Sequence, residues 1–408
     1  MNEEFRTDNG RWNILNVFRV IPTSCPKSRR TPTHHLNNIP TSTTGFVVER
    51  SQQNPVMDTT CSLAICSNHG CDQPGTNRCS ACKTTPYCGP ICQTADWVHH
   101  KEECPEHLRK VGMANLEKAK GFERERNWSQ TLRHAEIAST KLKQLKERPI
   151  EAIHNALRMK YNALSFSARH REALECAKEW YCLHPTNHTH PPAIVASFAV
   201  IESCIHNKEF FDAALYARTL WETITLSRDS HIPDNRREQF TARGALELAR
   251  ALWNLAAHGD MPAEEQQEAG VEAIMLARRS LEIYTQLHGA ESYQVANGMS
   301  VLADVLDYFN DVDDDESLRL REQAKVIFAR LQGSMSPNVA AGEYNLGAAY
   351  QNRARRAQTA NDMDRCVANL ELALSHLREA VRIYRAINYM DQADEAARTV
   401  VKIEEFLR

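Results

Sequence analysis

Cysteine is the most constraining feature of this chain of 408 residues, because eight of its 13 cysteines lie between Cys61 and Cys104. The other five are scattered, at Cys25, Cys176, Cys182, Cys204 and Cys366. The N-terminus has no positively charged start followed by an apolar stretch, so we expect no secretory signal and a cytoplasmic or nuclear protein. In these compartments thiols stay reduced, so a cysteine cluster indicates metal ligation and not disulfides.

The candidate ligands form four pairs. These pairs are Cys66 and Cys71, Cys79 and Cys82, Cys88 and Cys92, and His100 and Cys104. The second pair is a knuckle whose two thiolates can bind one ion, and the last two pairs have the i, i+4 spacing that places both side chains on one helix face. Eight ligands are enough for two tetrahedral zinc sites. The spacing leaves open whether the pairs fill the sites in succession or interleave.

The string CSACKTTPYCGPICQTADWVHHKEEC, with Cys66 and Cys71 upstream of it, resembles the MYND zinc finger. The match includes Tyr87 before Cys88, the pair Asp96-Trp97, and His100-Lys101. One departure is the gap of four residues between Cys66 and Cys71, where two is commoner, which leaves Cys61 or His69 as competitors for the first ligand.

The resemblance implies an interleaved arrangement of ligands. The first zinc would be held by Cys66, Cys71, Cys88 and Cys92, and the second by Cys79, Cys82, His100 and Cys104. All four positions of each ion are then filled by protein, so we expect two structural Zn²⁺ ions and no catalytic metal. A finger of this size has almost no apolar core, and zinc would supply its folding free energy, about 10–16 kcal/mol for each site.

The same resemblance implies that the finger binds short proline-rich peptides through Ser80, Gln93 and Trp97. An indole face suits an extended proline ligand, and the two polar side chains can bond its backbone. The alternative is that Trp97 only covers the thiolates and that Gln93 is solvated.

The charge balance argues against nucleic acid as a partner. The chain has 49 Lys and Arg against 52 Asp and Glu, a net charge of -3. With seven thiolates and two zinc ions included, the charge is nearer about -6. We also expect no membrane segment, because no run of 18 apolar residues is present.

Composition divides the chain into three predicted domains. Residues 1–60 are rich in Asn, Thr, Ser and Pro and are predicted to be disordered, and Met57 would allow a later start of the protein. Residues 61–106 form the finger. Residues 107–408 are predicted to contain about thirteen helices, because apolar helical spacing stops and restarts at successive prolines. The last helix, from Asp391 to Arg408, is interpreted as a cap.

Internal repetition indicates that these helices form a solenoid. An aromatic residue or histidine followed four residues later by leucine recurs at Trp128/Leu132, His170/Leu174 and Phe211/Leu215. Residues 287–306 align without gaps on residues 331–350, with seven identities. These repeats resemble tetratricopeptide repeats in the long form seen in kinesin light chains, which implies an all-α superhelix of antiparallel helix pairs. A generic helical bundle is the alternative.

We therefore predict a protein–protein interaction adaptor without enzymatic activity, whose finger binds a proline-rich peptide and whose solenoid binds a second, unknown protein partner. The alternative is a relative of the SET/MYND lysine methyltransferases. That alternative is disfavoured, because residues 105–260 are helical by pattern, whereas a SET domain needs many short strands and a glycine-containing cofactor loop.

Overall fold

The computed structural model describes residues 64–184, 190–226, 232–259, 261–309 and 315–408. The segment 1–60, predicted to be disordered, lies outside the described residues. The described residues divide into two compact units, one comprising residues 64–159 and the other the described residues from 160 to 408. Among the described helices none is both long and apolar enough to cross a membrane.

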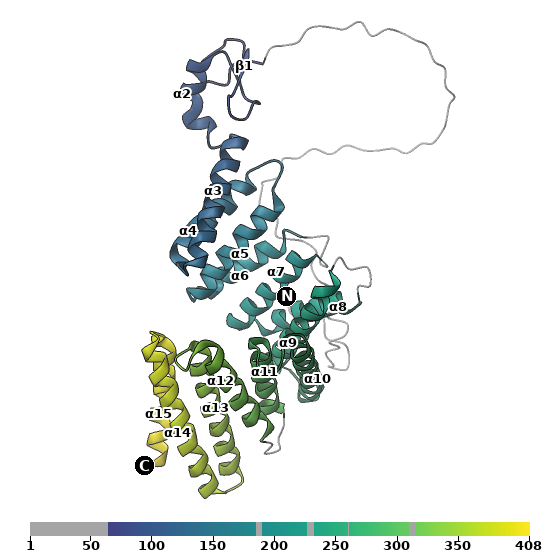
Figure 1. The fold of residues 1–408 in the computed structure, drawn as a ribbon, viewed down its shortest axis with the longest axis vertical. Coiled ribbons are helices and arrows are strands. Elements are labelled where there is room, and N and C mark those ends of the chain that lie inside the picture. Colours follow the sequence, from purple (N-terminus) through teal and green to yellow (C-terminus); the bar gives the residue numbers. More distant parts are fainter. Residues whose placement is uncertain (1–63, 185–189, 227–231, 260, 310–314) are drawn as a thin grey trace, which may run out of the picture. The chain divides into compact units, whose positions relative to one another are not determined.

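The described part of the smaller unit begins with a β-hairpin and a short helix (Figure 1). Strand β1 (Asn77–Arg78) pairs antiparallel with β2 (Pro86–Tyr87), and α2 (Pro90–His100) follows. Pro90 occupies the first turn of α2, where a missing backbone N–H costs no helical hydrogen bond. Helices α3 (Pro105–Arg124) and α4 (Trp128–Lys143) come next, and α5 (Ile150–Phe166) begins in this unit.

The core of the smaller unit's helices is built from small side chains. Leu116 and Ala119 of α3, Ala135 and Ala138 of α4, and Ala156 and Met159 of α5 form one buried cluster. Helix α3 also approaches α4 closely at Gly112, where a Cβ atom would lie 2.7 Å from the Leu142 side chain. Glycine at this position therefore sets the spacing between the two helices.

The larger unit contains the end of α5 and ten further helices in its described residues. They are α6 (His170–Tyr181), α7 (Pro191–His206), α8 (Phe210–Leu226), α9 (Asp234–His258), α10 (Ala263–His288), α11 (Tyr293–Phe309), α12 (Glu316–Gln332), α13 (Pro337–Thr359), α14 (Met363–Ala386) and α15 (Met390–Leu407). Six of the seven prolines that the sequence places at helix breaks precede or begin a helix, and Pro185 lies outside the described residues.

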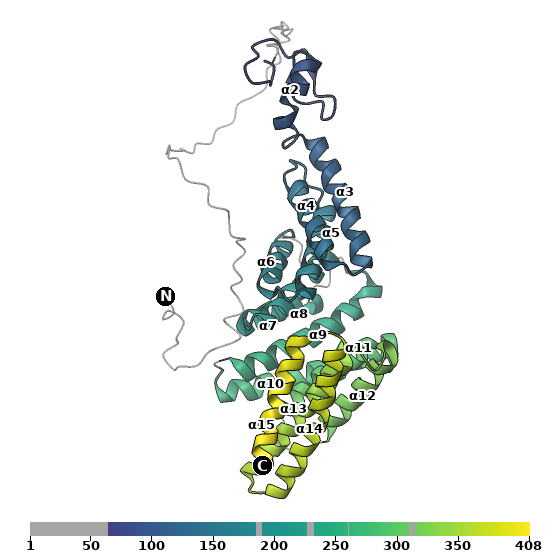
Figure 2. The same ribbon diagram turned by 90° about the vertical axis from the view of Figure 1, so that its left-hand side faces the viewer.

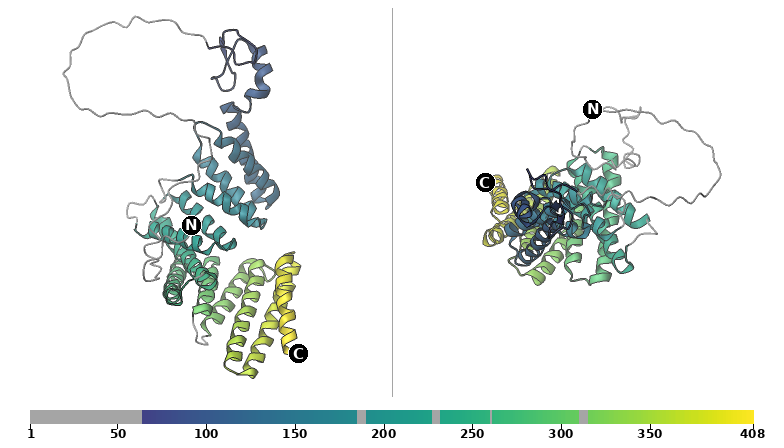
Figure 3. Two further views of the ribbon diagram at one scale, coloured as in Figure 1. Left: turned by 180° about the vertical axis from the view of Figure 1, so that it is seen from behind. Right: turned by 90° about the horizontal axis from the view of Figure 1, so that it is seen from above.

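Within the larger unit each helix from α6 onward packs against the next one in sequence. Helix α7 also contacts α9, and α9 contacts α11, so these three helices are neighbours in one layer. Figures 2 and 3 show this succession of antiparallel pairs from α6 to α15. Thirteen helices, α3 to α15, follow the finger in the described residues. The predicted fold class, a small finger followed by an all-α array of antiparallel helix pairs, is confirmed.

Two of the seven identical pairs in the aligned segments 287–306 and 331–350 mark helix boundaries. Gly289 and Gly333 end α10 and α12 with φ of 78° and 87°, a conformation that residues with a Cβ rarely adopt. The hydroxyls of Ser292 and Ser336 accept hydrogen bonds from backbone N–H groups at the starts of α11 and α13. The repeat in the sequence therefore includes turns and caps, and also buried helix positions such as Val295/Val339 and Leu302/Leu346.

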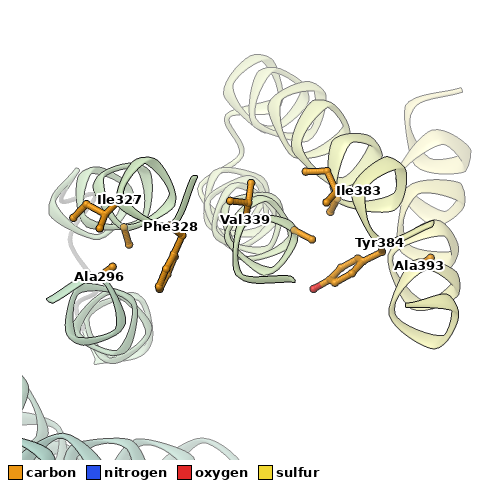
Figure 4. Packing of buried hydrophobic residues seen from close by; sticks show 10 residues of the cluster. Ala296, Ile327, Phe328, Val339, Ile383, Tyr384 and Ala393 are labelled. Carbon is orange, nitrogen blue, oxygen red and sulfur yellow. The ribbon is translucent and has the colours of Figure 1, made fainter. Parts of the chain in front are cut away.

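A buried cluster at the C-terminal end joins five successive helices, α11 to α15 (Figure 4). Phe328 and Ile327 of α12 lie on one side of Val339, and Ile383 and Tyr384 of α14 lie on the other. Ala393 brings α15 into the same cluster. Helix α15 buries only Ala393, Ala396 and Ile403 fully, and most of its other side chains are exposed, which fits the predicted cap.

Candidate metal centre

The hairpin and helix α2 place the four ligand pairs close together. Cys79 and Cys82 lie on the knuckle between β1 and β2, where Lys83 adopts a φ of 58° and donates its N–H to the carbonyl of Cys79. Cys66 and Cys71 flank a turn beside this hairpin, and Gly75 allows the close approach, because a Cβ there would lie 2.6 Å from Pro86.

The side chains form two groups of four in which all ligand atoms lie within 4.8 Å of one another. One group is Cys66, Cys71, Cys88 and Cys92, and the other is Cys79, Cys82, His100 and Cys104. The pairs therefore interleave along the sequence, as the resemblance implied. His69, the competitor for the first ligand that the structure describes, belongs to neither group, and Cys61 lies outside the described residues.

Both groups have the size of a zinc site. Sulfur atoms that share a tetrahedral Zn²⁺ at about 2.3 Å lie about 3.8 Å apart, and a sulfur and an imidazole nitrogen lie about 3.6 Å apart. In the first group the Sγ atoms of Cys71 and Cys88 are 3.7 Å apart, and those of Cys88 and Cys92 are 3.4 Å apart. In the second group Cys82 Sγ lies 3.5 Å from His100 Nε2. The residues present therefore fit a tetrahedral ion at each position.

Without a bound cation, ionisation of several neighbouring thiols is unfavourable, because the thiolates would repel one another. Cys92 and Cys71 raise the pKa of the Cys88 thiol to about 12. Burial opposes ionisation of Cys82, but hydrogen bonds from Thr84 and Thr85 lower its pKa to about 5. A bound dication removes the conflict in the first group, because only thiolates are ligands, and binding would release the protons that remain.

A second layer of hydrogen bonds orients the ligands. The Thr85 hydroxyl lies 3.4 Å from Nδ1 of His100, which leaves Nε2 facing the sulfur atoms. The Thr84 hydroxyl donates to Cys82 Sγ over 3.1 Å. The fully buried Tyr87 donates to the Asp96 carboxylate over 2.7 Å, and burial and this carboxylate raise its pKa. Thr84 and Thr85 are not among the residues predicted from the sequence, although they directly precede Pro86, Tyr87 and Cys88.

The second group is joined directly to helix α3. Cys104 is the N-cap residue of α3, and Pro105 follows it in the first turn. Two further contacts hold the finger against this unit's helices: Lys141 of α4 pairs with Glu102 over 2.6 Å, and the Trp97 ring meets the His107 ring edge to face at 5.4 Å. The finger and the start of the helical array therefore share one structural junction.

The three predicted peptide-binding residues lie beside the second group. The Gln93 amide nitrogen donates to the Ser80 hydroxyl over 2.8 Å and lies 3.7 Å from Cys79 Sγ. Trp97 lies one helical turn after Gln93 on α2, and its half-buried ring also contacts the His100 ring. Trp97 thus covers part of the ligand cluster while part of its surface stays accessible.

Comparison with known proteins identifies the finger. Residues 65–104 match the family model of the MYND finger. The chain is 50% identical over 36 residues to Tudor domain-containing protein 1 of Oryzias latipes, and 42% identical over 41 residues to Tudor domain-containing protein 1 of Danio rerio. These segments are 9% and 10% of this chain, and they span only 3% and 4% of the two relatives.

Two solved structures are similar to the helical part at 16% identity. One is a putative kinesin light chain with nearly identical TPR-like repeats from Podosopora anserina; the match covers 56% of this chain and 98% of that chain, with a TM-score of 0.40. The other is BtubC from P. vanneervenii, where the match covers 59% and 90% with a TM-score of 0.33.

Proposed function

We propose that this chain is a protein-interaction adaptor whose MYND finger, built on two structural zinc ions, binds a proline-rich peptide, while its helical array binds a second protein. The observation that carries the proposal is the surface formed by Ser80, Gln93 and Trp97 directly beside the second ligand group. A bound Zn²⁺ at each group would supply a crosslink that fixes this surface. The chain's own residues do the recognition.

The chemistry of this surface suits an extended peptide. The accessible part of the Trp97 ring offers an apolar face for a proline ring, and Ser80 and Gln93 offer hydroxyl and amide groups for backbone carbonyls. Because Gln93 and Ser80 already bond each other, their positions are set before a peptide arrives. A proline-rich ligand is similarly preorganised, so little conformational entropy is lost on binding.

The zinc assignment follows from the donor set. One group offers four thiolates, and the other three thiolates and an imidazole, and both combinations are typical of closed structural zinc sites. We propose a cytoplasmic or nuclear location for the same reason, since seven clustered thiols keep this role only where they stay reduced.

The absence of enzymatic activity is part of the proposal. The MYND finger is an interaction module, and both ligand groups already contain four protein ligands. The described residues between 105 and 258 form helices α3 to α9, whereas a SET domain is built from strands, so the methyltransferase alternative has no support.

The test is fluorescence anisotropy with dye-labelled decaproline and, as a reference peptide, decaglycine. We expect Trp97→Ala to weaken decaproline binding by about tenfold or more, because a buried aromatic contact is lost. Val98→Ala is the matched control, because Val98 is exposed on the same helix and belongs to neither ligand group. The zinc content of both variants is measured in parallel. Equal affinity of parent and Trp97→Ala, with zinc retained, would reject this peptide surface.

A further inference from the structure

A pocket of about 470 Å³ lies in the larger unit, lined by residues of helices α9, α11, α12 and α13. Trp253 of α9 and Tyr308 of α11 contribute the aromatic part of its wall. The polar part of the lining comes from α13, with Asn345, Asn352, Arg355 and Arg356. The finger contributes no residue to this pocket, whereas Asp304 and Asn345 belong to the repeated segments 287–306 and 331–350.

The acidic residues of the pocket are already paired. Asp304 and Asp307 of α11 both contact Arg321 of α12: Asp304 Oδ1 lies 2.7 Å from Nη1, and Asp307 Oδ2 lies 2.6 Å from Nη2. Arg321 is only 7% exposed, so this trio is a buried structural element. Three arginines and two aspartates line the pocket, so its lining has a net charge of +1, and its two remaining arginines, Arg355 and Arg356, lie outside the trio.

Those two arginines have no carboxylate partner in the described part of the chain. Arg356 donates to the backbone carbonyl of Asp307 over 2.9 Å, and Arg355 donates to the Asn352 side chain over 3.1 Å. Both guanidinium groups therefore keep donors for a ligand. In the same pocket, the buried Nε1 of Trp253 also has no acceptor among the described residues. The pocket thus has an excess of donors and positive charge, which favours a ligand that carries a carboxylate.

The arrangement of α13 favours a peptide over a small anion. Asn345 and Asn352 are seven residues apart on one helix, a distance of about 10 Å along its axis. Three residues of extended chain span about 10 Å as well, so the two amides can bond backbone groups at both ends of such a segment. Ala348 and Ala349 lie between them in the sequence, and their short side chains leave room for the backbone of a peptide to approach the helix.

We propose that this pocket binds an extended acidic peptide segment of a partner protein. A carboxylate pairs with Arg355 and Arg356, the backbone lies between Asn345 and Asn352, and an apolar side chain packs on the wall of Trp253 and Tyr308. This inference deepens the proposed adaptor function by naming the chemistry of the second partner. It does not depend on peptide binding at the finger, because all these residues belong to the larger unit.

The test is binding of the full-length zinc-loaded chain to an array of decapeptides. Each peptide contains one glutamate and one apolar residue, and the array covers every pair of positions that these two residues can occupy. An identical array with glutamine in place of glutamate is the reference. We expect stronger binding to the glutamate array, and we expect Arg356→Gln and Asn352→Ala each to reduce it by about tenfold, since each removes hydrogen bonds to the ligand. Arg398→Gln is the matched control, because Arg398 is exposed on α15 and lies outside the pocket.

Arg355→Gln is the second pocket variant, because Arg355 is exposed and its loss leaves the core packing unchanged. Equal binding to the two arrays, or an equal loss in Arg398→Gln and the pocket variants, would overturn the proposal. Glutarate is added as a competitor, and full competition at the concentration of the peptide would overturn the assignment to a peptide. Trp97→Ala is tested on the same array: unchanged binding there, together with lost decaproline binding, separates the two surfaces.

Discussion

The Tyr87 hydroxyl donates a 2.7 Å hydrogen bond to the Asp96 carboxylate, and this bond ties strand β2 to the middle of helix α2. Tyr87 is followed by Cys88, so the bond also fixes a residue of the first ligand group. We expect Tyr87→Phe to lower the zinc affinity of the finger by about tenfold or more, as is typical for lost outer-shell contacts. Competition with a chelator of known affinity measures this change.

Asp72→Asn is the control for that experiment, because Asp72 is exposed in the finger and makes no side-chain hydrogen bond within the described residues. An unchanged affinity in Tyr87→Phe would show that the Tyr87–Asp96 bond does not support the metal sites.

The two ligand groups differ in burial, which predicts an order of metal loss. Cys79 and Cys104 of the second group are fully buried, whereas Cys71, Cys88 and Cys92 of the first group are partly exposed. We expect the parent chain to contain two zinc ions, of which a chelator removes the first-group ion sooner. Cys71→Ser should leave one ion, because the second group draws its ligands from the knuckle, α2 and the start of α3.

Cys182→Ser is the control, because Cys182 belongs to neither ligand group. Atomic absorption of the purified chains measures the stoichiometry. Two ions in Cys71→Ser would mean that Cys71 is not a ligand.

The approach of Gly112 to Leu142 predicts opposite effects for two substitutions in α3. Gly112→Ala forces a methyl group against Leu142 and should lower the free energy of unfolding by about 1–3 kcal/mol. Gly121→Ala meets no atom within 4 Å, and it should raise this free energy by about 0.5–1 kcal/mol, because alanine restricts the unfolded chain. Urea unfolding followed by circular dichroism compares the two variants. Equal effects would show that α3 and α4 can move apart.

The buried trio around Arg321 predicts a large loss on removal of its cation. Burial raises the pKa of the Asp304 carboxyl, and Arg321 opposes that shift. Arg321→Met leaves Asp304 and Asp307 without their partner and should cost about 3–5 kcal/mol of stability. Adding Asp304→Asn and Asp307→Asn should recover most of the loss, and Arg330→Met, at an exposed arginine of the same helix, should cost little. Urea unfolding of the four chains tests this order.

Glu343 of α13 predicts a pH dependence of stability. Burial alone would raise the pKa of this carboxyl, but His376 at 2.7 Å and Lys325 at 3.1 Å lower it below the ordinary value of 4.5. Since the pKa is lower in the folded state, the contribution is complete above pH 4.5 and is lost as the pH falls through the folded value.

We therefore expect parent and Glu343→Gln to differ in unfolding free energy at about pH 6 and to converge near about pH 3. Taking the difference between the two chains removes the effect of zinc release at low pH. A constant difference over this range would contradict the assigned role of Glu343.

The sequence predicts the all-α class and the repeat well, because both depend on local signals. Prolines and capping serines mark helix ends wherever they occur, and Gly289 and Gly333 end their helices for steric reasons. The two ligand groups were implied only by the family resemblance, since spacing could not decide between successive and interleaved pairs. Two contacts depend on tertiary packing: the bond between Thr85 and His100, and the pairing of Arg321 with α11. No local sequence pattern predicts them.

Cys104 lies at the end of the finger and at the beginning of α3, with no residue between the two elements that could act as a spacer. A peptide held at Trp97 therefore has a fixed direction relative to α3. Its effective concentration near that helix is set by this fixed geometry and not by the motions of a flexible linker. A partner that touches both the finger and α3 must match this geometry with its own chain. Inserting glycines after Cys104 would leave each surface intact but would remove the advantage of binding both at once.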